Sequence, residues 1–124
     1  MRHVTERPAP HPRTRLDDNF ASPLRFSLQA AIGADIEIDF VTLREVLQCA
    51  DSPLSKAITH LQAAGYVSTR KGALGGRQRT WVRATAAGRE AFAGHLRALH
   101  EIVELGGTTP ERVEGQASDP TRSA

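Results

Sequence analysis

Residues 40–65 read FVTLREVLQCADSPLSKAITHLQAAG, and this stretch decides the fold. Apolar side chains recur at helical spacing on both sides of a break at Cys49-Ala50-Asp51. The spacing predicts one helix over 40–48 and a second over 52–64, which Gly65 ends. Two helices joined by so short a connection are typical of a helix-turn-helix.

Further elements are expected on both sides of this pair. Apolar residues at every fourth position of 24–32 predict an earlier helix, and a short extended piece follows at 36–38. After the pair, β-prone runs predict strands at 66–71 and 79–84. The glycine-rich, basic segment between them predicts a hairpin with a long, flexible tip.

The last predicted helix runs from Ala86 to about Leu105. Its apolar positions follow a 4-3-4 spacing, close to that of a coiled-coil seam; they are Phe92, Leu96, Leu99 and Val103. The caps expected at the four helix starts are Ser22, Asp39 or the Thr42–Glu45 pair, Asp51 or Ser52, and Thr85. The order of elements predicts an α+β, mostly helical fold: a winged helix-turn-helix with a two- to three-stranded antiparallel wing and a long C-terminal helix.

The length of 124 residues leaves room for one domain, which we expect over 16–105. Residues 1–15 carry three prolines and are expected to be a disordered basic arm; residues 106–124 are expected to be a disordered tail. No apolar run approaches the roughly 18 residues of a membrane span, and the N-terminus lacks the apolar core of a signal peptide. By elimination, we expect a cytoplasmic protein without a membrane partner.

The helix over 52–64 has two contrasting faces. Its apolar side chains fall within one arc and are expected in the core: Leu54, Ala57, Ile58, Leu61 and Ala64. The opposite side holds Ser52, Ser55, Lys56, Thr59 and Ala63, with His60 at its flank. A helix that enters the major groove needs short polar residues near base edges and no carboxylate near phosphates. An ordinary amphipathic surface helix is the alternative interpretation.

Charge along the chain supports the first interpretation. No Asp or Glu occurs between Ser52 and Arg89, whereas seven bases do: Lys56, Arg70, Lys71, Arg77, Arg79, Arg83 and Arg89. A basic block inside a folded segment indicates a polyanionic partner, although a solvated basic face is possible. The Gly-rich basic hairpin suits a sugar-phosphate backbone or a narrow minor groove.

Residues 16–105 resemble the winged-helix regulators of the MarR/ArsR superfamily, in particular its short one-domain members. The resemblance rests on SPLRFSLQAAI (22–32), DFVTLREVLQCADSPLSKAITHLQAAGYV (39–67) and KGALGGRQRTWVRATAAGREAF (71–92). One departure is Ala86, where such proteins often have a proline. The resemblance implies a DNA-binding regulator that is dimeric through its first and last helices.

The expected function is therefore a sequence-specific regulator, acting as a homodimeric repressor on double-stranded DNA. The helix over 52–64 would lie in the major groove and the wing, about 70–83, on the flanking backbone or minor groove. Expected DNA contacts are Ser52, Ser55, Lys56, Thr59, His60, Arg70, Lys71, Arg77 and Arg79. The expected dimer interface is formed by Leu24, Leu28, Phe92, Leu96, Leu99 and Val103.

Two other functions compete with this one. A winged helix also serves as a protein-interaction module without specific DNA binding, because a fold does not fix a function. The same basic surface would also suit structured RNA. No residue pattern supports an enzyme, a cofactor, a metal site or a small-molecule effector. Cys49 is expected to be a half-buried packing residue rather than an oxidant sensor, and Trp81 is expected on the outer face of the sheet.

Overall fold

The computed structural model describes residues 8–33 and 35–107, apart from the side chain of Leu74. It divides into two units: residues 17–95 form one, and the second joins the N-terminal segment up to Leu16 with the segment from Leu96 onward. Each unit is described by itself. The expected disorder of residues 1–7 and 108–124 lies outside the described residues.

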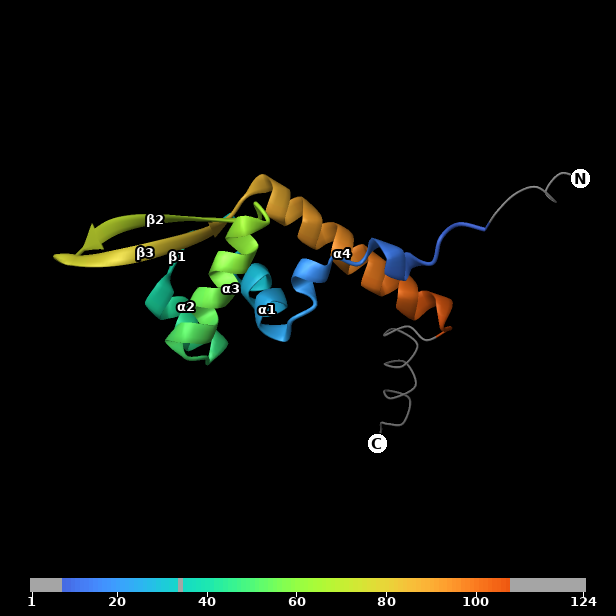
Figure 1. Ribbon diagram of the computed structural model, residues 1–124, viewed down its shortest axis with the longest axis horizontal. Coiled ribbons are helices and arrows are strands. Elements are labelled where there is room, and N and C mark those ends of the chain that lie inside the picture. Colours follow the sequence, from blue (N-terminus) through green and yellow to red (C-terminus); the bar gives the residue numbers. More distant parts are fainter. Residues whose placement is uncertain (1–7, 34, 108–124) are drawn as a thin grey trace, which may run out of the picture. The chain divides into compact units, whose positions relative to one another are not determined.

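The winged helix-turn-helix expected from the sequence is confirmed (Figure 1). Its helices are α1 (Pro23–Ala31), α2 (Phe40–Leu47), α3 (Asp51–Ala63) and α4 (Ala86–Leu105). Its strands are β1 (Ile38–Asp39), β2 (Val67–Leu74) and β3 (Arg77–Ala84), and short 3-10 turns η2 (Pro12–Arg15) and η3 (Asp18–Phe20) precede α1. The strands form one antiparallel sheet in the order β1-β3-β2.

The hairpin differs from its prediction. The strands continue to Leu74 and Arg77, so only Gly75 and Gly76 form the connection in place of a long, flexible tip. Both glycines have positive φ, 61° and 78°, as a tight two-residue hairpin turn requires. This turn fixes the register, in which Arg70 lies opposite Trp81 and Lys71 opposite Thr80.

Two of the predicted helix caps are confirmed. The Ser22 hydroxyl accepts a hydrogen bond from the Arg25 N–H at 3.3 Å, and the Thr85 hydroxyl accepts one from the Gly88 N–H at 2.9 Å. Asp39 occupies the N-cap position of α2 but makes no side-chain cap bond, and Ala50 occupies that of α3. The turn between α2 and α3 is tight because Gln48 adopts a left-handed conformation, with φ 53°.

The core of the larger unit lies between α1, α2, α3 and the sheet. Its fully buried apolar side chains are Leu28, Ile32, Leu43, Leu54, Leu61 and Val82. The inward face predicted for α3 is confirmed for Leu54, Ala57, Ile58 and Leu61, which are all buried, whereas Ala64 is only half-buried. On the sheet, Val82 and Ala84 face the core as expected.

One buried junction joins α1 and α4 to the start of β2 at Tyr66. The Tyr66 carbonyl accepts hydrogen bonds from the Thr85 N–H at 3.0 Å and from Nε2 of the fully buried Gln29 at 3.3 Å. The Tyr66 ring stacks on Phe20, with centroids 5.4 Å apart. Gly88 lies so close that a Cβ there would stand 2.1 Å from the Tyr66 carbonyl oxygen. Only glycine therefore fits at this position of α4.

In the smaller unit, residues 10–15 contact the end of α4. Arg15 Nη2 donates to Glu101 Oε1 at 2.6 Å, and Pro12 is buried. A hollow of about 480 Å³ lies there between Pro10, Pro12 and Leu105. Residues 12–15 thus differ from the expected disordered arm, because Pro12 at the start of the turn and the ion pair favour one conformation.

Substitution of Gly88 by Ala tests the junction. The added methyl group collides with backbone rather than with a flexible side chain, so α4 must shift. We expect the free energy of unfolding to fall by about 3 kcal/mol, the upper end of ordinary overpacking penalties. Urea denaturation followed by circular dichroism measures the change.

Gly33→Ala provides the matched control. A Cβ at Gly33 would meet its nearest neighbours at 3.4 Å, an ordinary contact. We expect this variant to stay within about 1 kcal/mol of the parent protein. Equal urea midpoints for Gly88→Ala and the parent would show that α4 does not depend on this close approach.

Candidate nucleic-acid interface

Helix α3 presents a polar surface that the core fixes in place. Its inward side chains are buried, whereas Ser52, Ser55, Lys56, Thr59 and His60 are all exposed. The one carboxylate on the helix, Asp51, lies in the first turn and pairs with Arg44 at 2.7 Å. The rest of the exposed face therefore carries no negative charge, as the sequence predicted.

A hydrogen-bonded chain that sequence reasoning missed holds His60. Its Nε2 lies 2.9 Å from Asn19 Oδ1, while the Asn19 amide donates to Asp17 Oδ1 at 3.0 Å. The Tyr66 hydroxyl donates to the other carboxylate oxygen of Asp17 at 2.6 Å. Burial acts to raise the pKa of Asp17, but these hydrogen bonds outweigh it and hold the pKa below its ordinary value. Asn19 Oδ1 can only accept, so His60 Nε2 carries the hydrogen in this bond.

The hairpin has two chemically different faces, because side chains alternate along each strand. The register puts Arg70 opposite Trp81 and Arg79 opposite Gly72, and Arg83 follows on the same side. We call this side the arginine face: Arg70, Arg79, Trp81 and Arg83. The other side, the lysine face, holds Thr69, Lys71, Thr80 and the buried Val82.

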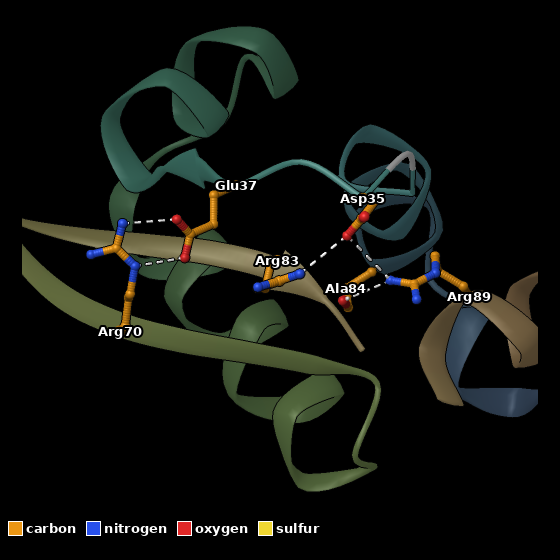
Figure 2. A network of polar contacts seen from close by, with 6 residues as sticks. All are labelled: Asp35, Glu37, Arg70, Arg83, Ala84 and Arg89. Atoms are coloured by element: carbon orange, nitrogen blue, oxygen red, sulfur yellow. Dashed lines mark hydrogen bonds and ion pairs between the residues drawn. The ribbon is translucent and has the colours of Figure 1, made fainter. Parts of the chain in front are cut away.

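Carboxylates occupy the arginine face (Figure 2). Glu37 accepts two hydrogen bonds from Arg70, at 2.7 and 2.8 Å, and Asp35 pairs with Arg83 at 3.1 Å. The hydrogen bond from Arg70 is the main reason that the pKa of Glu37 lies below its ordinary value. Arg70 also covers the Trp81 ring, 5.4 Å from its centroid, so Trp81 is half-buried on the outer face.

Asp39 links β1, α2 and β3 from a nearly buried position. Its carboxylate accepts from the Thr42 hydroxyl at 2.5 Å and from Arg79 Nη1 at 2.8 Å. The bond from Thr42, together with that from Arg79, lowers the pKa of Asp39 against the opposing effect of burial. Only 10% of the Asp39 side chain is exposed, so this pair is better shielded from solvent than the other two.

These pairs change the list of expected contacts. Arg70 and Arg79, both predicted to bind DNA, are each engaged by a carboxylate of the segment 35–39. Among the described residues of α3 and the hairpin, the cations without an ion pair are Lys56, Lys71 and Arg77. The signal in the sequence was the alternation Glu37-Ile-Asp39, which puts both acids on one side of an extended chain.

The residues expected at a dimer interface differ in exposure within the single chain. Leu28 is fully buried. Leu24 and Phe92 are half-buried against the same core. Leu96, Leu99 and Val103 on α4 are exposed by 43%, 37% and 41%, respectively. Of the expected set, these three present the most apolar surface to solvent.

The structure also bears on Cys49, on metal binding and on membrane spans. Cys49 is half-buried in the turn before α3. Within residues 8–33 and 35–107, no group of three His, Cys, Asp or Glu side chains is placed to hold a metal ion. No helix of the described part is long and apolar enough to cross a membrane.

Substitution of Asp39 by Asn tests the role of its carboxylate. Because the folded protein lowers the pKa of Asp39, the stabilisation is complete above the ordinary Asp value of about 4 and is lost as the pH falls through the folded value. We expect Asp39→Asn to reduce the free energy of unfolding by about 1–2 kcal/mol at pH 7. The difference from the parent should shrink below pH 4, as measured by urea denaturation across the pH range.

Asp35→Asn is the matched control, since this side chain is 69% exposed. An exposed ion pair contributes little, so we expect a change below about 0.5 kcal/mol at every pH. A deficit of Asp39→Asn that does not vary with pH would rule out the carboxylate as its origin.

Comparison with known proteins agrees with this architecture. The family described as winged helix DNA-binding domain matches residues 24–103. An uncharacterized protein of Methanocaldococcus jannaschii is 30% identical over 86 residues, which cover 69% of this chain and 90% of that protein.

Two solved structures show the same fold. A transcriptional regulator homologue from Pyrococcus horikoshii OT3 aligns with a TM-score of 0.66 and 24% identity, over 71% of this chain and 87% of its own. A protein of Bacillus cereus ATCC 10987, assigned as a MarR-like transcription regulator, aligns with a TM-score of 0.59 and 23% identity, over 87% and 81%. The helix-turn-helix, the two-stranded wing and the match over residues 24–103 lead to one conclusion: the chain belongs to the winged-helix DNA-binding domain family.

Proposed function

We propose that this protein is a sequence-specific transcriptional regulator that binds duplex DNA as a homodimer, most simply as a repressor. Helix α3 enters the major groove, and the hairpin lies over the adjoining backbone or minor groove. The observation that carries the proposal is the exposed face of α3, which has no carboxylate after Asp51 and lies beside the unpaired Lys71 of the hairpin. Phosphates supply much of the affinity at such a surface.

The ion pairs on the arginine face determine which cations we assign to DNA contact. Ser52, Ser55 and Thr59 are short enough to approach base edges, and Lys56, Lys71 and Arg77 provide unpaired charge. Arg70 and Arg79 hold the hairpin against the segment 35–39 and contribute less to DNA. His60 lies at the flank of α3, oriented by Asn19.

A protein-interaction module is the second candidate function, because winged helices also bind proteins. The charge distribution favours DNA over this candidate. A solvent-exposed helix ordinarily mixes charges of both signs, whereas α3 pairs its one acid with Arg44 and keeps its lysine free. Structured RNA would meet the same cations, so it serves as a competitor in the test.

The test starts from DNA fragments selected by the purified protein from a random duplex library. Fluorescence anisotropy then compares a selected duplex with a scrambled one at two salt concentrations. We expect preference for the selected duplex and strong weakening at higher salt. Lys56→Ala and Arg77→Ala should each weaken binding about tenfold and reduce the salt slope by about 1.

Arg83→Ala is the matched control, because it removes an equal charge from the same hairpin where Asp35 already neutralises it. We expect less than about a twofold change. Equal affinity for selected and scrambled duplexes, or binding that RNA displaces more readily than DNA does, would contradict the proposal. Salt-insensitive capture of one protein partner would favour the second candidate.

The homodimer rests on the exposed stripe of α4. Leu96, Leu99 and Val103 recur at the spacing of a coiled-coil seam. Three large apolar side chains on one side of a helix are costly to leave in water, and a second copy of the same helix offers a matching surface. Two protomers would then present two α3 helices to successive turns of the duplex.

A charge placed on this stripe should separate the protomers. We expect Leu99→Glu to raise the dimer dissociation constant about a hundredfold, because each copy would then place a carboxylate against its twin. Light scattering after size-exclusion chromatography measures the change. Ala93→Glu, on an exposed position off the stripe, should leave the mass unchanged; a monomeric parent protein would refute the dimer.

A further inference from the structure

Two hollows flank the exposed ridge of α3. One, of about 410 Å³, lies on the hairpin side; its polar lining is Gln62 of α3, Thr69 and Lys71 of β2, and Thr80 of β3, and its apolar lining is Phe40 and Ile58. The other, of about 340 Å³, is lined by Lys56 and His60. Ser55 and Thr59 line both hollows and so form the ridge that separates them. No carboxylate lines either one.

The helical period explains this arrangement. At about 100° per residue, Ser55 and Thr59 point in nearly the same direction. Lys56 and His60 lie about 100–140° to one side of Ser55, whereas Gln62 and Ile58 lie about 20° and 60° to its other side, toward the hairpin. The two hollows are thus the two flanks of one helix.

The major groove of DNA likewise has two sides, each bordered by one sugar-phosphate backbone. It is about 12 Å wide, close to the diameter of a helix with its side chains, and its two walls are the two sugar-phosphate backbones. A helix whose ridge faces the base edges therefore brings one flank to each strand. The hollow on the hairpin side meets one backbone, and the hollow at Lys56 meets the other.

The chemistry of the hollows suits a phosphate. The chain has two lysines, Lys56 and Lys71, and one lines each hollow. Neither makes an ion pair with the described residues. Lysine binds phosphate as a compact charge with three donors, and hydroxyl groups donate to phosphate oxygens. Arg70, Arg79 and Arg83 are on the opposite face of the hairpin and are held by carboxylates.

Each hollow is partly ordered before any ligand arrives. On the hairpin side, Gln62 Nε2 donates to Thr69 Oγ1 at 3.4 Å and so links α3 to β2. On the other side, Asn19 holds His60 by Nε2 and so restrains the imidazole ring that lines the hollow. Side chains that are already restrained lose less entropy on binding.

We propose that the two hollows are separate phosphate seats for the two opposite DNA strands. Lys71, with the hydroxyls of Thr69 and Thr80, holds a phosphate of one strand; Lys56, in the hollow that the His60 ring lines, holds a phosphate of the other. Asn19 acts as a positioning residue for His60. The inference rests on the proposed function and assigns to each lysine the strand that it contacts.

The test replaces single phosphates by neutral methylphosphonates, one at a time on each strand of a selected duplex. In the parent protein, we expect sensitive positions on both strands within the footprint of one protomer. Lys56→Ala should remove the sensitivity on one strand and Lys71→Ala that on the other. Each variant should bind the unmodified duplex about tenfold more weakly, and each serves as the matched control of the other.

A hydroxyl variant sharpens the assignment. Thr80→Val keeps the shape of the side chain and removes its donor, so we expect about threefold weaker binding and a loss confined to the strand of Lys71. Ser68→Ala removes an exposed hydroxyl on the opposite face of the same hairpin and should change nothing. Unchanged thermal midpoints show that the variants remain folded.

The outcomes distinguish failure of the proposed DNA binding from failure of the two phosphate seats alone. If no duplex is selected, the proposed function fails and the two seats fail with it. If a selected duplex binds but both lysines affect the same strand, or neither alters the methylphosphonate pattern, only the two-seat arrangement is overturned. Opposite strands for Lys56 and Lys71, mirrored in a second half-site of a dimer, support it.

Discussion

The arrangement of the larger unit depends on the close contact between α4 and the backbone at Tyr66. At this point the chain leaves α3 and enters β2, and β3 passes into α4 beside it. The Tyr66 carbonyl takes up both the first N–H of the turn into α4 and the buried amide of Gln29 from α1. Because Gly88 has no side chain, the first turn of α4 can lie directly on this carbonyl. The junction thereby sets the direction in which the hairpin leaves the core, and with it the angle between the hairpin and α3.

A second constraint sorts the charges of the hairpin. The Gly75–Gly76 turn fixes the strand register, and alternation along the strands then puts the arginines on one side and Lys71 on the other. The acids of segment 35–39 cover the first side, and α3 lies along the second. Ion pairs at such exposed positions add little stability. Their effect here is to decide which cations remain free.

The sequence was sufficient for the features that depend on local periodicity. The inward face of α3, the caps at Ser22 and Thr85, and the order of elements all follow from spacing and residue type. The pairing of Glu37 with Arg70 could not be predicted, since it joins residues 33 positions apart through a register that the expected long loop had obscured. The Gly-Gly pair was itself the signal of a two-residue turn. Likewise, burial of Leu28 and the bond from Asn19 to His60 depend on tertiary packing that no local pattern contains.

The neutralised arginine face has a consequence for how such a protein would find its site in a genome. Unrelated DNA competes for any basic surface, and its vast excess makes the ratio of specific to non-specific binding matter more than affinity alone. A hairpin with every arginine free would dwell on random sequence. By masking Arg70, Arg79 and Arg83, the acids of segment 35–39 reduce that indiscriminate attraction while leaving the charges nearest to α3 untouched. In a sequence-specific regulator of the kind proposed, carboxylates built into the fold would thus shorten the search by weakening binding to unrelated DNA.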